Sequence, residues 1–154
     1  MRIAIVAFGD ADAGDSGVGI EVVARMSTDH LPEHAVLING GTDVLRALES
    51  VRGFDGLIVV KSVAMGAAPG TVKTLDLNKM VFTGTSPPSA PNGTKWDSEL
   101  ILAQKFLDLP PTKIVGIEPE SSEGVSISPA LLSRIDSYVA AVKDAVSQLR
   151  SESQ

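Results

Sequence analysis

Short apolar runs alternate along the chain with longer amphipathic stretches, and this alternation restricts the fold more than any other feature of the sequence. Four runs have the length of buried strands: residues 3–8 (IAIVAF), 35–38 (AVLI), 57–60 (LIVV) and 114–117 (IVGI). The stretches between them hold helical patterns, which is the order expected of parallel strands joined by helices. The sequence therefore predicts an α/β fold with a mostly parallel sheet.

Helical spacing of apolar residues predicts the elements that join these strands. A first helix is expected from about Val18 to Met26, and Thr42 is expected to cap a second. Ser128 followed by Pro129 predicts the start of the final helix. That helix carries a single apolar stripe, formed by Leu131, Leu132, Ile135, Val139, Val142 and Val146.

Two segments depart from this pattern. Val72 to Leu75 alternates directly after a Pro-Gly pair, which predicts an edge or antiparallel strand. Thr83 to Thr94 contains three prolines and two glycines, so a long surface loop is expected there. A helix should follow this loop, with apolar anchors at Leu100, Ile101, Phe106 and Leu107.

Length and composition limit the classes of protein. The 154 residues suit one domain over residues 1–150, with residues 151–154 frayed at the C-terminus. A net charge of −6 argues against nucleic acids and anionic membranes as partners. No apolar run is long enough for a membrane span or a signal peptide. The chain has no cysteine, which fits a reducing compartment, so a cytoplasmic location is expected.

Ligands in open α/β sheets bind beyond the carboxyl ends of the strands. Four segments follow predicted strands in this way: Gly9 to Gly17, Asn39 to Asp43, Lys61 to Pro69, and Glu118 to Gly124. We expect them to lie along one edge of the sheet. Their polar residues are the expected binding cleft: Asp10, Asp12, Asp15, Asn39, Asp43 and Glu118.

The first of these segments, GDADAGDSG, allows four interpretations. A phosphate-binding loop is disfavoured because three aspartates would repel the phosphate. A calcium loop has the wrong residue at two of its five key positions. The pair Asp10 and Asp12 is similar to the start of haloacid-dehalogenase-type phosphatases, but the Thr and the later acids of that class are missing. The simplest interpretation is that the aspartates favour the helix N-terminus and the glycines permit the turn.

Three other polar residues need an interpretation. His30 and His34 lie in a connection at the opposite end of the predicted sheet, so they are expected to be solvated rather than catalytic. Lys61 follows an apolar run at the carboxyl end of a strand, where its ammonium would be partly desolvated. It is either a charge partner for the nearby aspartates, which we favour, or a base with a lowered pKa.

Five motifs in order resemble those of the hydrogenase maturation endopeptidases, over nearly the whole chain. They are residues 9–19 (GDADAGDSGVG), 39–42 (NGGT), 57–63 with 69–71 (PGT), 116–120 (GIEPE) and 127–129 (ISP). The resemblance implies a three-layer α/β/α sandwich around a sheet of about five strands. It also implies an endopeptidase that trims the C-terminal extension of a nickel–iron hydrogenase large subunit once nickel is inserted.

The family's metal-contacting residues are changed in this sequence. The resemblance implies three such side chains, and they match Ser16, Lys61 and the segment Asn92 to Thr94, which contains no histidine. An ammonium at this place would repel nickel. We therefore expect no metal ligands and no cofactor of the protein's own, although the family implies recognition of nickel on the substrate.

Three functions remain open at this point. The first is a relative that binds a hydrogenase large subunit, or a related maturation protein, with lost or altered metal-dependent peptidase activity. The second is a working endopeptidase that uses Asp10, Asp12 and Asp15 differently. The third is a repurposed hydrolase in which Ser16 is the nucleophile and Lys61 the base, with N–H groups of Gly17 to Gly19 holding an oxyanion.

Overall fold

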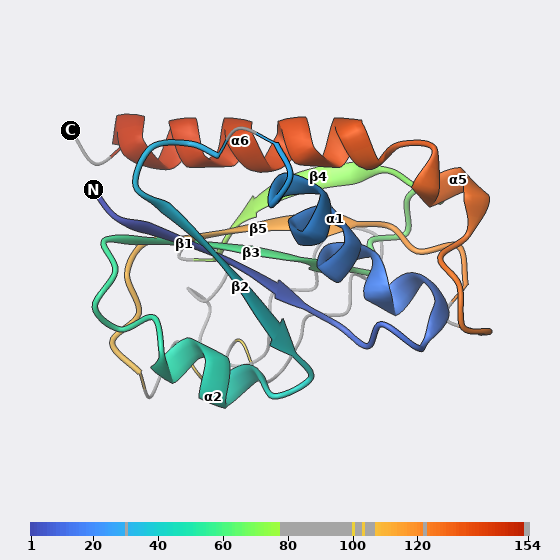
Figure 1. Cartoon of the computed structure of the whole chain (residues 1–154), viewed down its shortest axis with the longest axis horizontal. Helices are drawn as coiled ribbons and strands as arrows, with labels where there is room; N and C mark the ends of the chain where they lie inside the picture. The colour runs from blue at the N-terminus through green and yellow to red at the C-terminus, as the bar shows by residue number, and fades with distance from the viewer. Residues whose placement is uncertain (30, 78–99, 101–102, 104–106, 122, 153–154) are drawn as a thin grey trace.

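The fold is an α/β sandwich around one sheet. The structure, a computed structural model, describes residues 1–29, 31–77, 100, 103, 107–121 and 123–152. Within this part of the chain, five strands form a sheet in the order β2-β1-β3-β5-β4 (Figure 1). Their bounds are β1 Ile3–Phe8, β2 Ala35–Gly41, β3 Gly56–Ser62, β4 Val72–Asp76 and β5 Thr112–Ile117. Only β4 is antiparallel, so the predicted mostly parallel sheet and the antiparallel edge strand are both confirmed.

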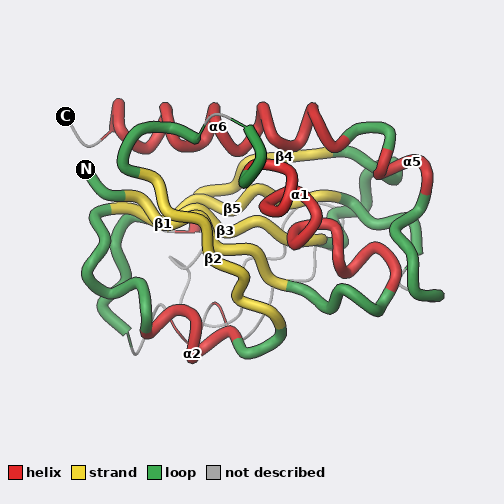
Figure 2. The backbone as a smooth tube through the Cα atoms, in the orientation of Figure 1, coloured by secondary structure: helices red, strands yellow, loops and turns green. Residues whose placement is uncertain are grey.

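Helices cover both faces of this sheet, which confirms the expected three layers. Figure 2 shows α1 (Val18–Met26) and α6 (Ile135–Glu152) on one side of the strands and α2 (Val44–Glu49) on the other. A cluster that includes Ile5, Val22 and Val142 fills the first interface. A second cluster, with Leu48 and Leu57 among its members, fills the other.

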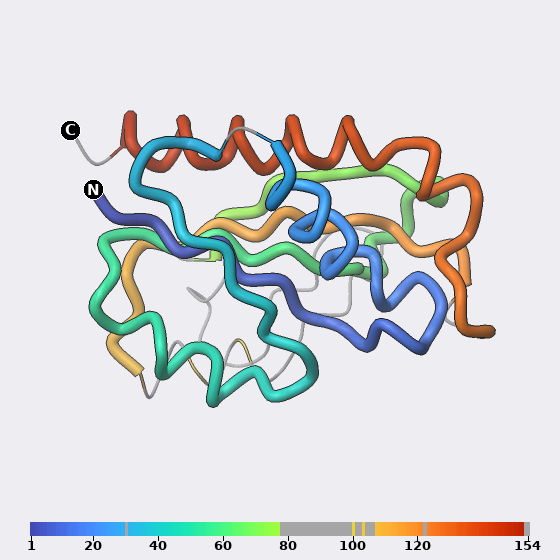
Figure 3. Tube along the Cα trace, in the orientation of Figure 1, coloured from blue at the N-terminus to red at the C-terminus, as the bar shows by residue number. Residues whose placement is uncertain are grey.

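The central strand is the run predicted to be most deeply buried. Leu57 to Val60 are completely inaccessible to solvent, and β3 pairs with β1 on one side and β5 on the other. Because these three strands are parallel, their carboxyl ends reach the same edge of the sheet. The connections that follow β1, β3 and β5 therefore come together at the end of the sheet opposite the two termini (Figure 3).

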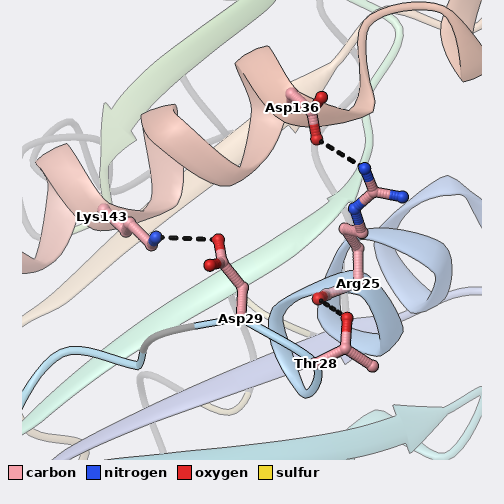
Figure 4. A network of polar contacts seen from close by, with 5 residues as sticks. All are labelled: Arg25, Thr28, Asp29, Asp136 and Lys143. Carbon is pink, nitrogen blue, oxygen red and sulfur yellow. Dashed lines mark hydrogen bonds and ion pairs between the residues drawn. The ribbon is translucent and has the colours of Figure 1, made fainter.

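Helix α1 approaches β3 unusually closely because residue 19 is a glycine. A Cβ placed there would overlap the carbonyl oxygen of Val60 and lie 3.2 Å from the Cα of Lys61. On its outer side, α1 and the turn after it are joined to α6 by ion pairs between exposed groups (Figure 4). These are Arg25 with Asp136 at 3.2 Å and Asp29 with Lys143 at 3.1 Å.

Two details of the helices differ from the sequence-based expectation. The cap of α2 is Asp43 rather than Thr42, since the Asp43 carboxylate accepts a hydrogen bond from the Arg46 N–H at 3.3 Å. The final helix is interrupted, so that α5 (Pro129–Leu132) ends before α6 begins. As a result Leu132 leaves the expected stripe and is 46% exposed.

The C-terminal helix is also longer than expected. It continues to Glu152, so Ser151 and Glu152 are helical rather than frayed. Glu152 accepts a hydrogen bond at 3.0 Å from the buried Lys113, which also lies 3.7 Å from Asp76. This pairing to a buried ammonium accounts for the extra helical residues, because it fixes the last turn to the sheet.

Several expectations fall on residues outside the described part of the chain. They concern the loop Thr83 to Thr94, His30 and most of the helix expected after the loop, of which Leu100 and Ala103 are described and buried. His34 lies in the turn before β2, with a φ of 59°.

No helix in the described ranges has the length and apolar character needed to cross a membrane.

We expect Gly19→Ala to lower the free energy of unfolding by about 2 kcal/mol, because the added methyl group overlaps a carbonyl of the central strand. Urea denaturation followed by circular dichroism measures this. Gly53→Ala is the matched control, since a Cβ there meets no atom within 4 Å. It should change the stability by less than about 0.5 kcal/mol. Equal effects of the two changes would contradict the close approach of α1 to β3.

Candidate functional site

A small hollow lies at the carboxyl ends of β1, β2 and β3. Its volume is about 220 Å³, and it is lined by Phe8, Gly9, Asp10, Ser16, Gly41, Thr42, Val44, Lys61 and Ser62. Strand β1 lies between β2 and β3, so the chain that leaves β1 turns to one side and the chain that leaves β2 crosses to the other. Open α/β sheets form ligand sites at this kind of position. The hollow thus brings together three of the residues considered from the sequence, namely Asp10, Ser16 and Lys61.

The loop after β1 places two of these residues by local hydrogen bonds. The hydroxyl of Ser16 accepts from the Asp10 N–H at 3.1 Å, and the Asp10 carboxylate accepts from the Asp12 N–H at 2.9 Å. Gly9 has a φ of 142° and a Cβ there would overlap the Ser16 carbonyl, so only glycine fits. Its N–H donates to the Gly41 carbonyl at 2.9 Å, which joins this loop to the end of β2.

Asp15 does not line the hollow, although the sequence placed it in the cleft. Its side chain is completely buried, and its carboxylate accepts hydrogen bonds from the backbone N–H groups of Glu120, Ser121 and Ser128 at 2.9, 2.9 and 2.6 Å. The Ser128 hydroxyl donates to it as well, at 2.8 and 2.9 Å to the two oxygens. Asp15 therefore joins the loop after β1 to the loop after β5.

These donors determine the ionisation of Asp15. Burial alone would raise the pKa of its carboxyl group, but the hydrogen bonds from Ser121, Ser128 and Glu120 outweigh burial and hold the pKa below the ordinary value of 3.8. The carboxylate is thus charged near neutral pH and fully used by protein donors. Ser128 is the N-cap residue of α5, as expected, but its hydroxyl donates to Asp15 and makes no hydrogen bond to the first turn of the helix.

Glu118 is a second buried carboxylate with a structural role. It is 6% exposed, and its Oε1 accepts from the N–H groups of Met65 and Ala67 at 2.7 and 2.8 Å. It therefore holds the connection after β3 in place. The sequence placed Glu118 in the cleft because it follows a strand, but its side chain turns into the protein instead.

The remaining expected cleft residues also act locally. Asn39 accepts from the Gly41 N–H at 3.0 Å, and Asp43 caps α2. Asp12 is exposed and does not line the hollow. Thr42 and Ser62 also line the hollow and lie within predicted segments, although neither was singled out as a cleft residue, whereas Phe8 lies outside these segments and was missed. The signal for them was available, because each lies at or directly after the carboxyl end of a strand.

The donors at the hollow do not form a set that suits a divalent cation. Among the described residues, the lining side chains supply the ammonium of the half-buried Lys61, the hydroxyls of Ser16, Thr42 and Ser62, and one carboxylate, that of Asp10. Across the residues that the structure describes, no three His, Cys, Asp or Glu side chains gather in a way that could hold a metal ion. The described part of the hollow is suited instead to polar or charged groups of another molecule.

A larger hollow of about 380 Å³ lies elsewhere, between α1 and the α5–α6 segment. It is lined by the Arg25–Asp136 ion pair and by the exposed Leu132 among others. None of the candidate residues of the strand ends takes part in it.

Comparison with known proteins gives a consistent result. The HycI hydrogenase maturation protease family matches residues 20–145. The hydrogenase expression/formation protein HupD of Rhodobacter capsulatus is 31% identical over 97% of this chain and 72% of the relative. HupD of Thiocapsa roseopersicina is 27% identical over 87% of this chain, which spans 62% of that relative's length.

Solved structures show the same fold. The hydrogenase maturating endopeptidase HybD from E. coli superposes with a TM-score of 0.75 at 23% identity, covering 96% of this chain and 93% of the other. The hydrogenase maturation protease HycI from Thermococcus kodakarensis superposes with a TM-score of 0.66 at 18% identity, covering 93% and 90%.

We expect Asp15→Asn to lower the free energy of unfolding by about 3 kcal/mol. The amide keeps the shape of the carboxylate but turns an N–H₂ group towards backbone N–H donors, which leaves buried donors without an acceptor. Urea denaturation at pH 7 measures the loss. Asp12→Asn removes an exposed carboxylate of the same loop and should change stability by less than about 0.5 kcal/mol. A similar loss in both variants would contradict the structural role of Asp15.

A comparison of wild type with Asp15→Asn over a range of pH should reveal the lowered pKa of Asp15. Because the folded-state pKa lies below the unfolded value of 3.8, the ionised carboxylate contributes its full stabilisation above that value and loses it as the pH falls through the folded pKa. The stability difference between wild type and Asp15→Asn should thus be constant near neutral pH and shrink only below about pH 3.8. A difference that stays constant as the pH falls below 3.8 would show an unlowered pKa, and one that grows there would show a raised pKa.

Proposed function

The chain belongs to the hydrogenase maturation protease family, and from this membership we propose that it binds the large subunit of a nickel–iron hydrogenase or a related maturation protein. The hollow at the strand ends is the proposed contact site. The metal-dependent peptidase activity of the family is lost or altered in this chain. The protein carries no metal of its own in this proposal, and any nickel involved belongs to the partner.

The donor set of the hollow is the observation that carries this proposal. Ser16 and Lys61, which by resemblance match two metal-contacting residues of the family, both line it. An ammonium group repels a divalent cation, and a hydroxyl is a poor ligand beside it. Nickel on a bound partner would thus meet a cation where relatives offer a carboxylate. The same ammonium can donate hydrogen bonds to carbonyl or carboxylate oxygens of a bound chain.

A working metal-dependent endopeptidase would need carboxylates in the hollow. Of the three aspartates considered for this role, Asp15 is buried and bonded to four donors, and Asp12 lies outside the lining. Only Asp10 remains, and its Oδ1 already accepts from the Asp12 N–H. The described geometry thus weighs against this alternative.

The Ser–Lys hydrolase has one observation in its favour, since Ser16 and Lys61 line the same hollow. The carboxylate of Asp10 lines the same hollow, so the Lys61 ammonium has an oppositely charged group beside it as well as the Ser16 hydroxyl. The Ser16 hydroxyl also accepts a hydrogen bond from the Asp10 N–H. We therefore keep this function as an alternative outcome of the experiment below.

We expect the wild type to show no nickel binding stronger than the millimolar range by isothermal titration calorimetry. The double variant Ser16→Glu with Lys61→Asp should gain micromolar affinity, because it supplies two carboxylates beside Asp10 in place of a cation. Lys61→Met is the matched control, since it removes the charge without adding a ligand, and it should gain far less. Micromolar binding by the wild type would contradict the proposal.

The partner is tested with a hydrogenase large-subunit precursor that retains its C-terminal extension. We expect the wild type to bind the precursor and to leave its mass unchanged on prolonged incubation, with or without nickel. Absence of binding would refute the proposed partner, and nickel-dependent cleavage would favour the active endopeptidase. Labelling of Ser16 by a fluorophosphonate that is lost in Lys61→Ala would favour the hydrolase.

A further inference from the structure

Strand β2 is an edge of the sheet. In the described part of the chain it pairs with β1 only, and in Figure 1 it crosses in front of the rest of the sheet. An edge strand presents a row of backbone N–H and C=O groups that can pair with another extended chain. The outer side of β2 can therefore form backbone hydrogen bonds with an extended peptide.

The hydrogen bonds show which groups face outwards. The carbonyl of His34 accepts from the Ile3 N–H of β1 at 3.1 Å. Backbone groups of alternate residues point to the same side of a strand, so those of Val36 and Ile38 face β1 as well. The backbone groups of Leu37 and Asn39 consequently face away from the sheet. As far as the chain is described, two donors and two acceptors thus point to the open side of β2.

The side chains of this edge are not of the kinds that usually protect an edge from pairing, although a register shift between Asn39 and Gly41 interrupts its pairing with β1. Proteins block such edges with charged residues, especially lysine, or with proline. The sequence of β2, AVLINGG, contains none of these, and Val36 is 39% exposed. An open edge of this kind can pair with an extended chain of another molecule.

The edge leads directly into the hollow. Gly41, the last residue of β2, lines the hollow together with Thr42. A chain that pairs with Leu37 and Asn39 would therefore continue past Gly41 to Lys61 and Ser16. No other edge of the described sheet has this property, because β4, at the opposite edge, supplies no lining residue.

We propose that the outer edge of β2 binds an extended segment of the partner protein as an added strand and guides it into the hollow. This inference rests on the proposed function and specifies how that partner is held. The segment is the C-terminal extension of the large-subunit precursor. A second copy of this chain fits the edge less well, because two chains that each carry a net charge of −6 repel one another.

Amide hydrogen exchange by NMR tests this placement directly. In the free protein, the amides of Val36 and Ile38 should be protected and those of Leu37 and Asn39 should exchange quickly. A saturating synthetic peptide with the sequence of the extension should slow exchange at Leu37 and Asn39 by at least about tenfold. Protection of these two amides in the free protein that increases with protein concentration would instead assign the edge to a second copy and overturn the proposal.

A pair of variants tests the same contact through the backbone. Asn39→Pro removes an outward N–H without removing a bond to β1, and Asn39→Ala removes the same side chain but keeps the N–H. We expect the proline variant to bind the extension peptide at least about tenfold more weakly than the alanine variant. Thermal denaturation shows whether both variants are folded. If the proline variant is not folded, the exchange measurement on the wild type tests binding at the β2 edge.

The outcomes separate this inference from the proposed function. The wild type could bind the precursor while exchange at Leu37 and Asn39 stays unchanged and the two variants have equal affinities. This result would refute binding at the β2 edge but would still support the proposed partner. Failure of the wild type to bind either the precursor or the peptide would refute the partner itself.

Discussion

The buried carboxylate of Asp15 is the interaction on which the shape of the strand-end region depends. It joins the loop after β1 to the loop after β5 through four donors, all supplied by residues more than a hundred positions later in the chain. A charged group is stable in the interior only when its lone pairs are satisfied in this way. Loss of this contact would separate the two loops, and Asp10 and Ser16 would lose the frame that holds them at the hollow.

The hollow itself results from close packing around glycines and carboxylates. Gly19 lets α1 lie against β3, Gly9 lets the first loop turn back on Ser16, and Glu118 fixes the connection after Lys61. The acids of this region are thus divided between two roles. Those that are buried hold loops together, and among the described residues Asp10 is the acid that lines the hollow.

The fold could be predicted from the sequence, whereas the roles of individual acids could not. Strand runs such as Leu57 to Val60 and the alternation at Val72 to Leu75 reflect burial of one or both faces, a property that each segment carries in its own residues. Whether Asp15 or Glu118 faces a ligand depends on donors that lie far away in the chain, at Ser128 and at Met65. The cap of α2 was misplaced by one residue because Thr42 and Asp43 are both good caps, and only the backbone geometry selects between them.

The combination of a retained scaffold and an altered charge explains why binding and cleavage need not change together. A maturation protease must hold its partner's chain, and the open edge of β2 and the hollow depend on backbone geometry that the glycines and Asp15 preserve. In the proposed function, recognition of a divalent cation depends instead on the side chains at the end of β3 and in the first loop. By the same proposal, a lysine at position 61 replaces a metal-contacting acid of the family without disturbing the strand, because β3 pairs through Leu57 to Val60 with both neighbouring strands. A change in these side chains therefore alters metal recognition while the surfaces that hold a protein chain stay in place.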